Sequence, residues 1–203
     1  MSIINDYKEI LAEIAREWDK ADKDIKFAEQ VCQKITISSI FELRYAGRRI
    51  IDALNMIAAD ADLKDVTLLL QEAKFDCHRA RHDAIDAATS KIALDIDNMG
   101  RKLGYNAILK AYPGFAAFRY LLSGIRKKIA ASRGNRQNRE AIYASIEEDG
   151  FKGLVDEFDK IQEAEKIMKS LAKRERVIFL GGIAGIVIGA IGIAVTIFIA
   201  IVD

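Results

Sequence analysis

The last part of the sequence contains 26 consecutive residues, Val177 to Val202, without one charged side chain. About 20 apolar residues are enough for a helix to cross the hydrocarbon core of a bilayer. At about 1.5 Å per residue this run would be about 39 Å long, so as a helix it can span the core with some tilt. The run therefore predicts one transmembrane helix at the C-terminal end and a tail-anchored protein.

Charged residues flank this run unequally. Five basic residues precede it, and Asp203 is the one charge that follows it. Positive charge is enriched on the cytoplasmic side of membrane helices. We therefore expect residues 1–172 to form a cytoplasmic domain and residues 173–203 to form a juxtamembrane segment and the transmembrane helix. The five basic residues are Lys166, Lys169, Lys173, Arg174 and Arg176.

Glycines recur at every fourth position of the apolar run, at Gly181, Gly185 and Gly189. Small residues at this spacing give a membrane helix a flat side, which a second helix can approach closely. The pattern predicts a homo-oligomer held together in the bilayer by these three positions. One helix cannot enclose a pore, but a ring of copies can. The alternative is that these glycines reflect only the general frequency of glycine in membrane helices.

The remainder of the chain shows apolar residues at helical spacing and no strand pattern. We expect helices over about 4–34, 38–59, 63–99 and 115–131, with a short helix before Pro113 and another after 138. The third should end on Gly100 or Gly104. The last should start near Leu154 and continue without a break into the apolar run. The predicted fold class is all-α, a bundle of about six helices with one C-terminal transmembrane helix.

A net charge of only +1 conceals a strongly basic segment. Residues 101–139 contain ten lysines and arginines and no aspartate or glutamate, with five aromatic residues between them. Basic side chains neutralise phosphates and aromatic rings stack on bases, so this combination favours a nucleotide or short oligonucleotide as ligand. Arg133, Arg136 and Arg139 stand three apart around a predicted helix start, where backbone N–H groups also attract anions.

The predicted ligand site combines this segment with basic residues of two other helices. Its members are Arg119, Arg126, Lys127, Lys128, Arg133, Arg136, Arg139, Tyr112, Tyr120, Arg44, Arg48, Arg79 and Arg81. Two alternatives use the same charges differently. The segment can form a basic collar against anionic lipid headgroups, or it can pair with acidic residues of a neighbouring subunit.

Both histidines of the chain lie on one predicted helix, where His78, His82 and Asp86 follow each other at intervals of four. Helices offer metal ligands at this spacing. A pattern without a further ligand favours ordinary hydrogen-bonded histidines at the edge of the core, so we predict neither a metal nor a cofactor. The sequence also contains no glycine-rich phosphate loop and no cysteine pair at metal spacing. These absences favour a protein that is not an enzyme.

The stretch "ELRYAGRRI" followed by a helix with "RHDAID" resembles the all-helical HEPN superfamily. Active members of that superfamily cut RNA with an arginine separated by four to six residues from a following histidine. The corresponding positions before His82 hold Cys77, Asp76 and Phe75. The resemblance therefore implies the fold without the ribonuclease motif.

The order of parts, a helical domain with a basic segment joined to one glycine-containing membrane helix, resembles small membrane effectors of bacterial anti-phage systems. Among these it is similar to the Hailong type, in which a bound DNA oligomer holds a channel effector closed. The resemblance implies an ion channel or pore of the bacterial inner membrane, gated by a nucleotide or oligonucleotide. The alternatives are a membrane-tethered HEPN-like nuclease that uses His78, His82 and Asp86, and a non-catalytic tail-anchored adaptor.

Overall fold

The computed structural model describes the backbone of residues 7–135 and 137–202, and the side chains of these residues except 149 and 194–202. Every regular element in the described residues is helical, which confirms the all-α class. The elements are α1 (Lys8–Cys32), α2 (Ile37–Ala58), α3 (Leu63–Leu103), α4 (Tyr105–Ala111), α5 (Phe115–Gly134), α6 (Arg139–Ile146), η2 (Glu147–Phe151), α7 (Lys152–Glu163) and α8 (Glu165–Val202).

The described residues thus contain eight α-helices and one π-helical segment, more than the bundle of about six that the sequence predicts. The interruption that the sequence predicts between residue 138 and Leu154 lies at Gly150, and a further break at Ala164 divides the predicted last helix in two. Gly150 in η2 has φ +128°, a conformation that favours glycine, and it separates α6 from α7. A turn at Ala164 separates α7 from α8. The predicted unbroken helix from Leu154 into the apolar run is therefore wrong, although i→i−4 bonds on both sides of Ala164 keep the backbone helical in its hydrogen bonding.

The chain forms two compact units. The first contains residues 1–96 and 119–156, and the second contains 97–118 and 157–203. Three helices, α3, α5 and α7, contribute residues to both units. The candidate sites described below each lie within one unit.

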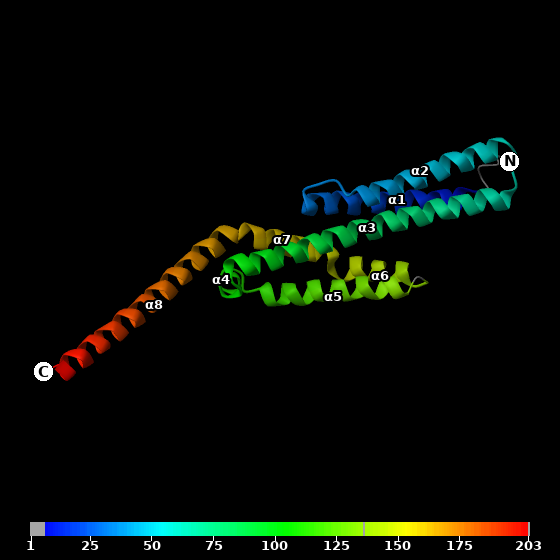
Figure 1. Ribbon diagram of the computed structural model, residues 1–203. Coiled ribbons are helices and arrows are strands. Elements are labelled where there is room, and N and C mark those ends of the chain that lie inside the picture. The colour runs from blue at the N-terminus through cyan, green and yellow to red at the C-terminus, as the bar shows by residue number, and fades with distance from the viewer. Residues whose placement is uncertain (1–6, 136, 203) are drawn as a thin grey trace. The chain divides into compact units, whose positions relative to one another are not determined.

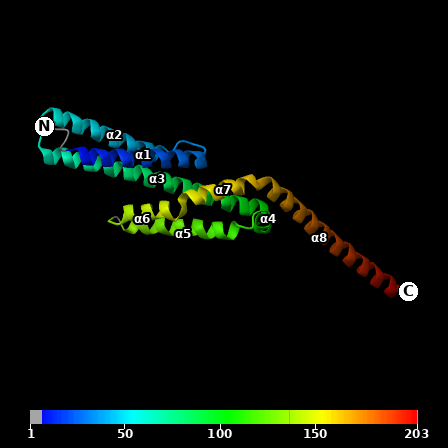
Figure 2. The same cartoon turned by 180° about the vertical axis from the view of Figure 1, so that it is seen from behind.

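In the first unit, α1, α2 and the first part of α3 lie side by side (Figures 1 and 2). Helix α2 packs inward through small residues, because Ser39, Ala46 and Ala53 are fully buried and stand seven apart. Gly47 faces the Trp18 ring, where an added Cβ would lie 3.6 Å from Cη2. The small inward side lets the backbone of α2 approach its neighbours closely.

The second unit joins the end of α3, α4, the end of α7 and the start of α8. Helix α3 ends at Leu103, and Gly104 follows with φ +80°. Gly104 is one of the two positions at which the sequence predicts the end of this helix. Lys110 of α4 lies 2.6 Å from the Glu175 carboxylate of α8. Arg176 of α8 donates a hydrogen bond of 2.5 Å to the backbone carbonyl of Lys102. These contacts hold α8 against α4 and the end of α3 just before the apolar run.

Candidate functional site

Helix α8 is the one helix in the described residues that is long and apolar enough to cross a membrane. Its segment Glu165–Ile193 contains an 18-residue stretch with a mean hydropathy of 2.2, and none of that stretch is buried inside the protein. Isoleucines and valines that would normally form a core are exposed here, for example Ile186 at 74%. Exposed apolar surface of this extent fits a bilayer better than water.

The three predicted glycines lie on one side of α8. An added Cβ at Gly181, Gly185 or Gly189 would have no atom of the chain within 4 Å. Gly182 and Gly192, which the sequence analysis did not include, lie on the same side. A helix turns about 100° per residue, so all five fall within an arc of about 100°. The sequence contains a pattern that could have identified these two glycines. Gly182 lies three residues before Gly185 and Gly192 lies seven residues after it, and both spacings keep residues on one helix face.

The described part of the first unit contains a polar centre around Arg81 of α3. This side chain is only 2% exposed and meets three glutamates from other elements. Arg81 lies 3.1 Å from Glu17 of α1 and 2.9 Å from Glu147 of η2, and it donates a hydrogen bond to Glu140 of α6. A buried arginine requires such partners, because an unpaired charge is very costly to remove from water.

Both histidines belong to this polar centre. His78 brings both ring nitrogens to carboxylates, with Nε2 at 3.3 Å from Glu17 Oε2 and Nδ1 at 3.2 Å from Glu140 Oε2. His82 Nε2 lies 3.0 Å from the same oxygen of Glu140, and its ring stacks on Tyr143 at a centroid distance of 3.8 Å. The structure therefore brings the two predicted histidines together on one carboxylate.

Asp86, the third member of the predicted metal pattern, points elsewhere. Its carboxylate accepts a hydrogen bond of 2.6 Å from the Tyr143 hydroxyl and lies 3.5 Å from Arg133. The reason is geometric: each step of four residues advances about 40° around the helix, so Asp86 lies about 80° from His78. Glu17 and Glu140, rather than Asp86, are the carboxylates that lie beside the histidines.

Burial and neighbouring charges shift the pKa values in the centre. Burial lowers the pKa of both histidines, which favours their neutral forms. Burial alone would raise the pKa of Glu140, but the hydrogen bond with His82 and the charge of Arg81 outweigh it and lower the pKa to about 2. Burial, together with the neighbouring Glu147, raises the pKa of Asp24 to about 7.

Replacing Asp24 with asparagine should make the first unit more stable at pH 8. Folded Asp24 holds a proton that the unfolded chain releases from about pH 4 upward, so the parent loses stability as pH rises from about 4 to 7. The variant should lack this loss and gain on the order of 1–3 kcal/mol at pH 8, since one pKa unit corresponds to about 1.4 kcal/mol. Trp18, the one tryptophan, reports unfolding by its fluorescence. If the free energy of unfolding depends on pH in the same way for the parent and the variant, the raised pKa of Asp24 is contradicted.

The basic residues of α5 within the first unit form a row on its exposed side. Arg119, Arg126 and Arg133 are exposed and seven apart, so they lie on one side of the helix about 10 Å from each other. Tyr120, which is 84% exposed, and Lys127 lie beside this row. We call these five residues the α5 basic row. Leu122, Ile125 and Ile129 are buried on the neighbouring side of α5, centred about 70° around the helix from the three arginines.

The other predicted ligand residues near this row lie as follows. Arg136 lies outside the described residues. Arg139 is half-buried with its guanidinium 5.6 Å from the centre of the Tyr143 ring. Lys128 is half-buried and donates a hydrogen bond of 3.0 Å to the Ser145 hydroxyl. Tyr112 belongs to the second unit, where its hydroxyl donates to Glu157.

The predicted additions from α2 and α3 are engaged differently. Arg81 is buried in the polar centre, and Arg79 contacts Glu42 at 3.0 Å and also pairs with Asp76. Arg48 is exposed and pairs with Asp52 at 3.0 Å, while Arg44 is exposed. Arg79 and Arg81 are thus partly and fully buried, respectively, and each pairs with carboxylates of the same chain.

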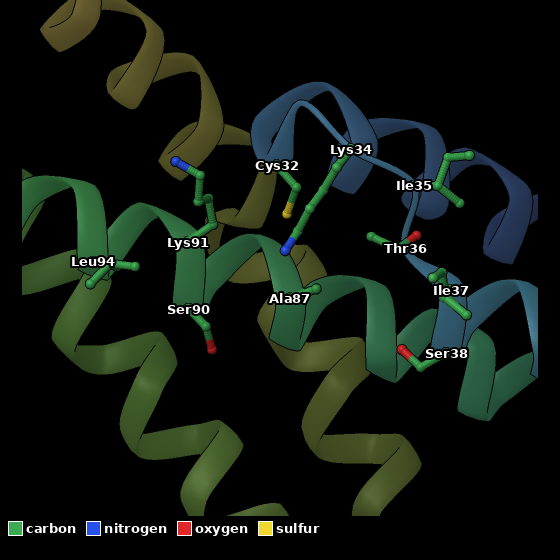
Figure 3. A pocket seen from close by; sticks show the side chains of 10 residues that line it. All are labelled: Cys32, Lys34, Ile35, Thr36, Ile37, Ser38, Ala87, Ser90, Lys91 and Leu94. Atoms are coloured by element: carbon green, nitrogen blue, oxygen red, sulfur yellow. The ribbon is translucent and has the colours of Figure 1, made fainter.

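A shallow pocket of about 520 Å³ opens where the turn between α1 and α2 faces α3 (Figure 3). Cys32, Lys34 and Thr36 line it from the turn, and Ser90 and Lys91 line it from α3. Its lining is mainly apolar and includes none of the residues predicted to bind a ligand. Burial raises the pKa of the Cys32 thiol, so this cysteine is a poor nucleophile.

Comparisons with known proteins returned no match: no family model, no curated protein and no solved structure is similar to this chain.

Proposed function

We propose that this chain is a non-enzymatic membrane effector that assembles through α8 and binds a phosphate-bearing ligand through its first unit. The assembled α8 helices form an ion channel or pore in the bacterial inner membrane, and the bulk of the chain faces the cytoplasm. The observation that carries the proposal is α8 itself, whose apolar segment is wholly exposed and bears five glycines on one side. An anchor alone has no need for a glycine side, whereas packed membrane helices do.

The junction between α4 and α8 supports a role beyond anchoring. Lys110 and Lys102 of the second unit hold the start of α8 through Glu175 and Arg176. Helical backbone then continues from Glu165 to Val202 without a further break in the described residues. A displacement of α4 and the end of α3 would therefore be transmitted along α8 into the bilayer. Such transmission is what a ligand-controlled pore requires.

The α5 basic row supports the ligand proposal. Three arginines at intervals of about 10 Å, with Tyr120 and Lys127 beside them, offer charge for phosphates and a ring for a base. Arg133 is 70% exposed in its contact with Asp86, and such surface pairs contribute little, so a phosphate can replace that partner. The ligand class is a nucleotide or short oligonucleotide. It controls the pore only by binding one state better than the other. A role in anti-phage defence follows from the architectural resemblance.

Replacing Arg126 or Arg133 with alanine should weaken binding of a fluorescent single-stranded DNA 12-mer to the full chain in detergent. Each loss removes a charge-assisted contact and should cost on the order of 1–3 kcal/mol. Binding of the parent should also fall steeply with salt, and each variant should reduce the slope of log K against log salt by about 0.7. Fluorescence anisotropy at several salt concentrations measures both quantities.

Lys26→Ala is the matched control, because Lys26 is exposed on α1 and pairs with Asp22 along its own helix. It should bind like the parent. The ligand proposal would be contradicted if the parent and the Arg126→Ala, Arg133→Ala double variant bind the DNA 12-mer with equal affinity. In that case the α5 basic row would contact lipid headgroups or another subunit.

A further inference from the structure

Both ring nitrogens of His78 face carboxylate oxygens from other helices. Nε2 lies 3.3 Å from Glu17 Oε2, and Nδ1 lies 3.2 Å from Glu140 Oε2. Imidazole nitrogens and carboxylate oxygens are familiar metal ligands, and a metal ion would bind one of the two nitrogens.

The positions of three side chains suit a metal ion. One ligand atom each from Glu17, His78 and Glu140 lies within 4.8 Å of the others. Tetrahedral zinc with bonds of about 2.1 Å separates its ligand atoms by about 3.4 Å, close to the 3.3 Å between His78 Nε2 and Glu17 Oε2. The three residues come from α1, α3 and α6, so the folded first unit is needed to assemble them.

The surroundings supply the remaining requirements of a metal site. Arg81 pairs with Glu140 Oε1, and His82 lies 3.0 Å from Oε2, so both fix this carboxylate in place. Glu17, Glu140 and Glu147 converge on Arg81, and Glu17 also pairs with Lys20 at the surface. The side chains of Glu17 and Glu140 are 15% and 40% exposed, which leaves a path for an ion.

We propose that Glu17, His78 and Glu140 bind a divalent transition-metal ion such as Zn²⁺, with solvent as a further ligand. The ion joins α1, α3 and α6 and so stabilises the first unit. The adjacent Cys77 is fully buried and does not belong to the group of side chains whose ligand atoms meet. This site goes beyond the proposed membrane function and is independent of it.

The test is a titration of the full chain, without a purification tag, in detergent after treatment with a chelator. Co²⁺ is the probe, because tetrahedral cobalt absorbs visible light. We expect one Co²⁺ per chain, and we expect the absorption to disappear when Zn²⁺ is added. Glu17→Gln, Glu140→Gln and His78→Gln should each weaken Co²⁺ binding at least tenfold. Circular dichroism confirms that each variant is folded.

Asp86→Asn is the matched control, since Asp86 lies on the same helix but its carboxylate contacts Tyr143 and Arg133. It should bind Co²⁺ within twofold of the parent. Absence of Co²⁺ binding to the parent overturns the proposal without the need for any variant. Equal affinity of the parent and the folded His78→Gln variant overturns it as well. Neither result bears on membrane assembly, because the titration uses no bilayer and no nucleotide.

Discussion

Replacing Arg81 with methionine is expected to destabilise the first unit by about 3–5 kcal/mol, because it leaves three glutamates without their shared buried partner. Folded domains are stable by only about 5–15 kcal/mol, so this change removes much of the total. Methionine extends about as far as the arginine Nε, so it keeps the packing of the aliphatic part of the side chain and removes the guanidinium group. The loss should therefore report the charge rather than a cavity. Urea unfolding of the full chain in detergent, followed by Trp18 fluorescence, measures it.

Arg48→Met is the control for this comparison. Arg48 is 73% exposed and pairs with Asp52 on the same helix, an arrangement that contributes at most about 1 kcal/mol. Its midpoint in urea should stay close to that of the parent. A loss below about 1 kcal/mol for Arg81→Met would mean that the three carboxylates do not depend on the guanidinium.

Replacing Gly185 and Gly189 together with leucine is expected to dissociate the assembly. Within the chain these changes meet no atom, since an added Cβ at either position has nothing within 4 Å. A leucine there prevents close approach of a second helix, and the contacts that depend on that approach are lost. The mass of the detergent-solubilised particle should fall from that of an oligomer to that of one chain, or the affinity between chains should fall at least tenfold.

The control places a leucine on the other side of α8. Val187 lies two positions from both Gly185 and Gly189, so it points about 160–200° away from them, and it is 51% exposed. Val187→Leu should leave the particle mass unchanged. Equal masses for the parent and the double glycine variant would show that other residues hold the copies together. The large apolar side chains exposed on α2, such as Phe41, Tyr45 and Ile51, would then be the next surface to test.

The sequence predicted the features of this chain that depend on local pattern. The apolar run predicted α8, the helical spacing predicted the all-α class, and Gly104 predicted the end of α3. Each of these signals lies within a few neighbouring residues. The turn at Ala164 was missed because alanine is a strong helix former and gives no signal of a break.

The polar centre was missed because its members are distant in sequence. Glu17 and Glu140 each look like a carboxylate on the solvent side of an amphipathic helix, and 64 and 59 residues separate them from Arg81. Only the packing of α1 and α6 beside α3 reveals that they meet. The histidines were noticed from their spacing, but Asp86 contacts Tyr143 instead of the histidines, because two steps of four residues turn it about 80° around the helix from His78.

Current across a planar bilayer that contains the purified full chain tests the central claim most directly, namely that copies of α8 assemble through their glycine side into a pore. The parent should produce discrete current steps, and these should vanish in the Gly185→Leu, Gly189→Leu double variant while Val187→Leu keeps them. Addition of the DNA 12-mer on the domain side should change the fraction of time spent open. A parent that inserts into the bilayer and passes no current, or glycine variants that conduct like the parent, would contradict the account.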